Sequence, residues 1–206
     1  MTESETGHRS QFFALYLVRF AARFGFSALV ILLPYYVNQL HASGLMTGLF
    51  YTGFTAAQLV AVVPLAWAGD RYDKRLVLLG ALGVGAVVYA LFTLVTSPVA
   101  LVGIRALQGV VVVALSLLTL AYVGELATPE TRANKIGKSN AARFAAAIAG
   151  SFTAGILYPW VGFEPVFWVL VVLYVATFIA IVFFLRPDEA IIRGFPFSGL
   201  AFNRRI

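Results

Sequence analysis

The sequence predicts an all-α, polytopic membrane protein built as a bundle of six transmembrane helices. Hydrophobic residues make up 61% of the 206-residue chain and charged residues only 12%, against about 45–50% and about 25% in a typical soluble domain. A soluble fold of this length could not hide so much apolar surface, so lipid must solvate the chain. The apolar runs are about 20 residues long and do not alternate with polar residues, which favours helices over strands.

Six apolar segments are each long enough to cross a bilayer as a helix. They cover residues 12–37, 44–68, 76–95, 99–123, 139–157 and 166–185. Turn-forming residues separate them: Pro98 precedes the fourth segment, Pro159 and Pro165 bracket the link between the fifth and sixth, and Pro187 follows the last. Residues 1–11 form a polar N-terminal segment. Its acidic residues and the long apolar run after it are not those of a cleaved signal peptide, so we expect the first helix to remain in the mature protein.

The basic residues predict the orientation of the chain. With the N-terminus inside, twelve Lys and Arg fall on the inner segments and none on the outer loops, which cover residues 38–43, 96–98 and 158–165. This excess predicts that both termini face the cytoplasm and that the protein lies in the cell membrane. It also explains most of the formal net charge of +6 without nucleic acid as a partner.

Several chemistries lack the residues they need. The chain has no Cys and only two His, His8 and His41, so we expect no metal site, no cofactor and no thiol or His-centred catalysis. An intramembrane enzyme would need a nucleophile with a base, and Ser151 has no His within the spans to activate it. The sequence therefore predicts that the protein is not an enzyme.

Small residues recur on the fifth segment at a spacing that places them on one helix face. This stripe lets another backbone approach closely and consists of Ala142, Ala146, Gly150 and Ala154. The sixth segment is bulky instead, with Phe167, Leu170 and Tyr174 among its large side chains. We expect the fifth helix to pack inside the bundle and the sixth to face lipid.

Two motifs resemble those of the major facilitator superfamily. The loop at residues 66–75 reads Ala-Trp-Ala-Gly-Asp-Arg-Tyr-Asp-Lys-Arg, and the family pattern is Gly-x-Leu-Ala-Asp-Arg-x-Gly-Arg-Arg. Asp70, Arg71, Lys74 and Arg75 match, whereas Asp73 stands where the family has its second Gly. In the fourth segment, Arg105, Gln108 and Gly109 match the family's Arg-x-x-Gln-Gly.

The resemblance implies more than the residues alone show. The chain is similar to the N-terminal six-helix half of that family, made of two three-helix repeats, with residues 12–185 as the half and residues 186–206 as the start of a cytoplasmic central loop. We expect either a truncated chain, which we favour, or a half-transporter that works as a homodimer. The expected partners are therefore the lipid bilayer, a small-molecule substrate, and a missing C-terminal half or a second copy.

The signature loop implies a gate. In the family, charges at this place latch the outward-facing state and separate when the inner gate opens. The resemblance assigns that role to the loop residues and to an acid at the end of the fourth helix: Asp70, Arg71, Lys74, Arg75 and Glu125. The alternative is a solvated loop that only sets topology.

Three arginines inside the spans have no acid at bilayer depth to pair with. A charge within a bilayer is costly and marks a functional candidate by default. We expect Arg23 and Arg105 to face the central path and to attract a substrate carboxylate or phosphate. The alternatives are that Arg19 extends to the inner headgroups and that Arg105 serves helix packing or coupling. Polar side chains that could compensate them are Gln58, Gln108 and Asn140.

The sequence as a whole predicts a secondary transporter that moves a small solute by alternating access. A drug or metabolite efflux carrier and an organic-anion carrier remain open. A non-transporting membrane scaffold subunit is the alternative from another class. In a scaffold, Arg23, Arg105 and Gln108 would face helix contacts rather than water.

Overall fold

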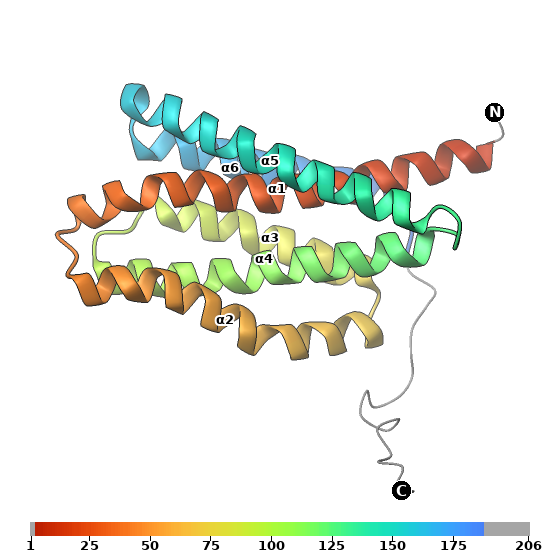
Figure 1. Ribbon diagram of the computed structural model, residues 1–206, viewed down its shortest axis with the longest axis horizontal. Coiled ribbons are helices and arrows are strands. Elements are labelled where there is room, and N and C mark those ends of the chain that lie inside the picture. The colour runs from red at the N-terminus through yellow and green to blue at the C-terminus, as the bar shows by residue number, and fades with distance from the viewer. Residues whose placement is uncertain (1–2, 188–206) are drawn as a thin grey trace, which may run out of the picture.

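The computed structural model of the chain describes residues 3–187, which form six α-helices with short connections (Figure 1). Each helix is long and apolar enough to cross a membrane. The prediction of an all-α, six-helix membrane bundle is therefore confirmed. The helices are α1 (Glu3–Gln39), α2 (Gly44–Arg71), α3 (Lys74–Phe92), α4 (Pro98–Leu126), α5 (Arg132–Val161) and α6 (Phe163–Phe184).

Several helices extend beyond the apolar segments that predict them. α1 begins at Glu3 rather than at residue 12, and α5 begins at Arg132 rather than at residue 139. Hydropathy marks only the part of a helix that lipid can cover, whereas the main-chain hydrogen bonds continue through polar residues. α3 differs in the other direction and ends at Phe92, before the predicted residue 95, because Thr93 N–H turns back to the carbonyl of Ala90 at 3.1 Å.

The predicted outer loop at residues 158–165 is wrong. Only Gly162 separates α5 from α6, and its φ of 76° lies in the left-handed region that glycine tolerates. Pro159 lies in the last turn of α5, and Pro165 lies in the first turn of α6, where the amide has no partner within the helix. The two prolines therefore mark the ends of two helices that nearly touch.

Side-chain caps begin three of the helices. Ser43 and Ser97 accept hydrogen bonds from the third amide of α2 and α4, at 3.4 Å and 3.2 Å. Asp73 caps α3, and its carboxylate accepts from Arg75 N–H at 2.8 Å. Its φ of −55° needs no glycine, so Asp73 replaces the family's second Gly at the signature loop without strain.

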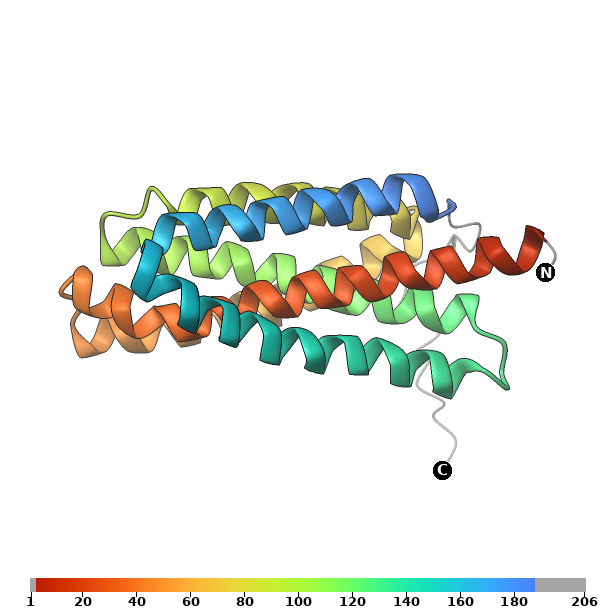
Figure 2. The ribbon, with the colours of Figure 1, turned by 90° about the horizontal axis from the view of Figure 1, so that it is seen from above.

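The helix contacts repeat within the chain. α1 packs mainly on α5 and α4 mainly on α2, while α3 packs on α6. Exchanging α1 with α4, α2 with α5 and α3 with α6 leaves this pattern unchanged, which is the arrangement expected of two three-helix repeats. In Figure 2, α3 and α6 lie along one edge of the bundle, α5 lies along the other, and α1 runs between them.

Both connections after the even-numbered helices α2 and α4 lie at one end of the bundle (Figure 1). The first turns of α1 and the end of α6 lie at the same end. We call it the basic end, after the side chains that it carries: Arg71, Lys74, Arg75, Arg132, Lys135 and Arg186. The opposite end holds the other three connections, which contain no Lys or Arg.

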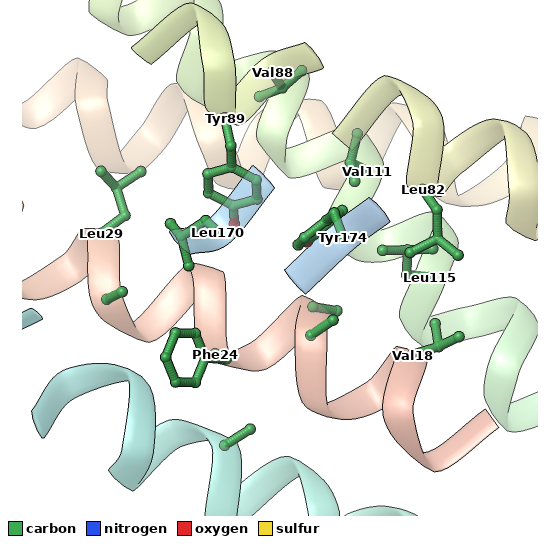
Figure 3. Close-up of a cluster of buried hydrophobic side chains, with 14 of the residues drawn as sticks. Val18, Phe24, Leu29, Leu82, Val88, Tyr89, Val111, Leu115, Leu170 and Tyr174 are labelled. Atoms are coloured by element: carbon green, nitrogen blue, oxygen red, sulfur yellow. The ribbon is translucent and has the colours of Figure 1, made fainter. Parts of the chain in front are cut away.

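The core lies where α1, α3, α4 and α6 meet (Figure 3). The rings of Phe92 and Phe167 stack there with centroids 5.2 Å apart. Leu170 and Tyr174 of α6 are also buried, so the expectation that the bulky side chains of α6 face lipid is wrong for this face. They are buried because α3 packs along α6 and needs large side chains to fill the contact.

α5 is less enclosed than expected. Its buried side chains form one stripe of small residues, Ser139, Ala146, Gly150 and Ala154. The other faces carry exposed side chains such as Phe144, Ile148 and Phe152. The stripe therefore predicted the face on which α5 packs, but not how much of the helix the bundle covers.

Two glycines mark the places where helix backbones come closest. A Cβ at Gly150 of α5 would meet the backbone of Phe24 on α1. A Cβ at Gly109 of α4 would meet the backbone of Phe54 on α2. Each contact joins one of the two main crossing pairs, so both pairs depend on a glycine at the crossing point.

We expect Gly150→Ala and Gly109→Ala to lower the thermal midpoint of the detergent-solubilised protein by several degrees. The added methyl group meets main-chain atoms that cannot rotate away, and overpacking of this kind costs about 1–3 kcal/mol. Gly155→Ala and Gly103→Ala lie on the same two helices with open space around them. These controls should leave the midpoint unchanged or raised, and an equal loss in all four variants would contradict the crossing contacts.

Candidate functional site

An ion pair joins α3 to α4 at the basic end. Lys74 Nζ lies 3.1 Å from Glu125 Oε1, and the lysine side chain is only 3% exposed, whereas that of Glu125 is 42% exposed. Lys74 is the first residue of α3, and Glu125 lies in the last turn of α4. The pair therefore holds together two helices from different repeats, and solvent at Glu125 moderates its strength.

The same end ties α6 to the bundle. Arg75 Nη2 donates to the carbonyl oxygen of Val182 at 2.8 Å, near the end of α6. The hydroxyl of Tyr122 donates to the carbonyl oxygen of Arg186 at 2.7 Å, just beyond α6. The last carbonyls of a helix have no partner within it, so Arg75 satisfies one such carbonyl of α6, and Tyr122 satisfies a carbonyl just beyond the helix.

Asp70 and Arg71 lie outside this network. Both are exposed, and Arg71 places its guanidinium 5.4 Å from the ring centroid of Trp67. Among the described residues, Asp70 makes no hydrogen bond or ion pair. The structure therefore brings together Lys74, Arg75 and Glu125 of the predicted gate and leaves Asp70 and Arg71 on its surface.

Asp73 also lies at the basic end, where it caps α3. In the sequence it stands out only as a departure from the family pattern. Its position directly before the first turn of α3 is the signal that could have identified it, because Asp is a preferred N-cap.

Arg105 is enclosed within the helices, with 1% of its side chain exposed. Its Nε donates to the carbonyl oxygen of Phe50 at 3.3 Å, and its Nη1 donates to Gln108 Oε1 at 2.6 Å. The guanidinium also lies 4.5 Å from the ring centroid of Phe54. A main-chain carbonyl, an amide and an aromatic face thus stabilise the charge without an acid.

Gln108 extends this network to α3. Its Nε2 donates to the hydroxyl of Tyr89 at 3.0 Å, and both side chains are fully buried. The Tyr89 hydroxyl lies directly over Gly25 of α1, where a Cβ would strike it. Arg105 and Gln108 therefore face helix contacts, which differs from the expectation that Arg105 lines an open path.

Arg19 does not extend to the end of the bundle. Its Nη1 donates to the carbonyl oxygen of Ser116 at 3.3 Å, and its Nη2 donates to Asn140 Oδ1 at 3.2 Å. The side chain is 7% exposed. It joins α1 to α4 and α5, so the alternative in which Arg19 extends to the headgroups does not describe its position.

Arg23 is half-buried and lies one turn beyond Arg19 on α1. Its guanidinium is 4.8 Å from the ring centroid of Phe26. That ring is 5.1 Å from the ring of Phe54, which in turn faces Arg105. Two phenylalanine rings therefore separate the half-buried Arg23 from the enclosed Arg105, and motif comparison identified neither ring.

Arg143 is the charged residue that sequence reasoning misplaced. The charge pattern of the sequence groups Arg143 with the Lys and Arg of the inner segments, but it lies within α5, one turn after Asn140, which accepts a hydrogen bond from Arg19. Its own guanidinium lies 4.7 Å from the ring centroid of Phe144. Its place inside the predicted span of residues 139–157 was the signal that should have separated it from the loop residues.

The small residues that the sequence singles out lie where helices pack together. Gly109, Gly150, Ala146 and Ala154 are all buried at helix contacts. Within residues 3–187, no group of three His, Cys, Asp or Glu side chains could hold a metal ion. Residues 188–206, which the sequence assigned to a central loop, lie outside the described residues.

The fold and the two motif regions define a class of membrane protein, the six-helix bundle of paired three-helix repeats. The family model of the Major Facilitator Superfamily matches residues 15–200. The chain therefore belongs to the Major Facilitator Superfamily.

Two relatives of known name are similar in sequence. The triacylglyceride transporter of Mycobacteroides abscessus is 32% identical over 137 residues, which cover 64% of this chain and 26% of that protein. The staphyloferrin B transporter of Staphylococcus aureus is 30% identical over 183 residues, covering 85% of this chain and 42% of that protein. The chain thus spans about a quarter and about two fifths of these relatives.

Solved structures share the fold at low sequence identity. A peptide transporter in complex with alafosfalin superposes with a TM-score of 0.74 at 15% identity and covers 88% of this chain and 42% of that one. The human organic anion transporter MFSD10 superposes with a TM-score of 0.72 at 18% identity and covers 87% and 48%. These structures establish the architecture of the helices.

We expect Tyr89→Phe to destabilise the protein by about 1–3 kcal/mol. The substitution removes the oxygen that accepts from Gln108 and leaves a buried amide N–H without a partner. Tyr35→Phe is the matched control, because Tyr35 is exposed. Thermal unfolding of both variants in the same detergent measures the difference, and equal midpoints would show that the buried hydrogen bond contributes nothing.

A second prediction concerns the basic end. Glu125→Gln should cost about 1 kcal/mol, because it removes the charge of a carboxylate that lies 3.1 Å from the buried Lys74 Nζ, while solvent screens the carboxylate side. The double variant Lys74→Met with Glu125→Gln should recover part of that loss, because no charge then needs a partner. Unfolding midpoints of the two single variants and the double variant test this coupling, and strictly additive losses would contradict it.

Proposed function

We propose that the protein is a secondary transporter, not an enzyme, and that it moves a small solute across the cell membrane by alternating access. The family match over residues 15–200 carries this proposal, since the named relatives are transporters. In such folds two six-helix halves rock about a site near the bilayer midplane. The half-buried Arg23, on a central helix, supports a polar path in this bundle.

The proposal places the basic end in the cytoplasm. Lys and Arg are retained on the cytoplasmic side of membrane proteins, which supports an orientation with both termini inside. The contacts of Lys74 with Glu125 and of Arg75 with Val182 then act as an inner gate that links α3, α4 and α6. Asp70 and Arg71, which are exposed, are available to a further part of the transporter.

That further part is a C-terminal half or a second copy of this chain. α2 and α5 both carry exposed large apolar side chains, including Leu59, Val60, Ile148 and Phe152. A helical half packed on this face would cover them.

A non-transporting scaffold subunit is the second candidate. The burial of Arg105 and Gln108 among helix contacts favours it, because a scaffold needs no polar path. The half-buried Arg23 and the charge of Arg143 beside it favour a transporter instead. A scaffold has no reason to keep these charges within the spans.

Thiol labelling tests alternating access without knowledge of the solute. The chain has no Cys, so Val30→Cys adds the only thiol of these 206 residues. Val30 is half-buried and lies on α1, in the part of the helix that is nearer the end opposite the basic end. In the full-length natural protein, freed of any other Cys, a membrane-impermeant reagent added outside should label it. Adding Glu125→Gln weakens the inner gate by about 1 kcal/mol, which should slow outside labelling by about fivefold as the protein shifts toward the inward-facing state.

The matched control is Leu45→Cys, at the exposed first turn of α2. Its labelling should be the same with and without Glu125→Gln, because that position stays accessible in both states. Unchanged labelling at Val30→Cys would contradict the gate and favour the scaffold.

A further inference from the structure

Three arginines lie on the packed helices α1 and α5 without an acid. Arg19 and Arg23 lie one turn apart on α1, and Arg143 lies on α5 one turn after Asn140, which accepts a hydrogen bond from Arg19. The sequence has no Asp or Glu at residues 6–69 or 131–163. Since all three side chains carry positive charge, they repel one another, and neither helix has a carboxylate within its membrane span to compensate them.

The cluster also contains donors that the bundle leaves open. Arg19 gives two of its nitrogens to Ser116 and Asn140, but its Nε is buried and has no hydrogen-bond partner within the described residues. The Nε of Arg143 is also buried, and no described residue accepts a hydrogen bond from it. Buried donors of this kind are costly unless an acceptor completes them.

The neighbouring Arg105 shows how this protein compensates a charge that stays internal. Its guanidinium bonds a carbonyl and an amide and faces an aromatic ring, and it is almost completely enclosed. Arg19 also bonds a carbonyl and an amide, but its Nε has no acceptor within the described residues. Arg23 and Arg143 each lie over an aromatic ring, and the Nε of Arg143 has no acceptor in that part of the chain. The rings of Phe26 and Phe54 lie between Arg23 and Arg105. These two rings therefore close the arginine cluster on the side that faces Arg105.

We propose that Arg19, Arg23 and Arg143, with Asn140, form a binding site for the carboxylate or phosphate group of the transported solute. The half-buried Arg23 makes the first contact, and Arg143 pairs with the anion from α5. Arg19, held by Ser116 and Asn140, supplies the deepest charge. Guanidinium groups suit this role because their donors match the two oxygens of a carboxylate or phosphate. This inference rests on the proposed transport function.

The depth of the site favours a solute over a lipid headgroup. At 1.5 Å per residue, Arg143 lies about 16 Å along α5 from Arg132 at the basic end. Arg19 is enclosed by α1, α4 and α5 rather than facing the surroundings of the bundle. A phosphate at the membrane surface would not meet these groups, whereas a solute inside the bundle would.

Citrate and inorganic phosphate are suitable probes for this site. The purified full-length protein is unfolded thermally in detergent with rising concentrations of each anion, against sodium chloride of equal ionic strength. We expect at least one of the two to raise the midpoint of the natural protein. Arg143→Gln and Arg23→Gln should weaken the apparent affinity for the stabilising anion tenfold or more. Arg132→Gln, which removes an exposed charge from α5, should leave this affinity unchanged.

A second readout keeps the test informative if a variant folds poorly. Without any anion, Arg143→Gln should raise the midpoint, because it relieves the repulsion on Arg19 and Arg23. A lowered midpoint would mean that another part of the protein already supplies an acid, and would overturn the proposal. Arg143→Lys, which keeps the charge but loses the planar fork, should retain weakened binding.

The remaining outcomes separate this inference from the proposed function. No stabilisation by either anion, or an equal loss in Arg132→Gln, overturns the anion site. Stabilisation by phosphatidylglycerol vesicles over phosphatidylcholine vesicles, with none by citrate or phosphate, assigns the cluster to lipid and also overturns it. In each case the labelling of Val30→Cys still tests alternating access independently. The proposed transport function can therefore be supported even where the anion site is contradicted.

Discussion

Lipid offers neither hydrogen bonds nor solvation for charge, and this constraint governs the polar interior of the protein. A polar group within the spans is stabilised when the protein itself supplies its partner, from the same helix or from another. Arg105 finds its partners on α2 and α4, and Gln108 extends them to Tyr89 of α3. The arginine is thereby fixed in place by groups that also hold three helices together, so the same contacts serve charge compensation and packing.

The number of helices could be predicted because it depends on a one-dimensional quantity, whereas the orientation stays a prediction. Runs of apolar residues set the spans, and the distribution of Lys and Arg favours one orientation. The link between α5 and α6 was predicted wrongly because a proline signals an interrupted helix without saying how many residues the interruption needs. Gly162 turns the chain alone, since its left-handed φ reverses direction within one residue.

The candidate site residues were harder to place because the direction of a side chain depends on packing. The motif identified Arg105 and Gln108, but nothing in their spacing shows that Phe50, Phe54 and Tyr89 enclose them. Arg143 was missed because a basic residue near a predicted inner loop resembles a topology signal. Its relation to Arg19 appears only when α5 crosses α1 at Gly150 and brings Asn140 within hydrogen-bond distance.

The two crossing pairs of the bundle differ in how they treat positive charge. The α2–α4 pair meets at Gly109 and encloses Arg105 with partners drawn from its own helices. The α1–α5 pair meets at Gly150 in the equivalent arrangement, but it holds three arginines with too few acceptors. Since the repeats share one architecture, packing alone does not require this difference. The proposed solute site accounts for the difference, because a bound anion would supply the acceptors that the α1–α5 pair lacks.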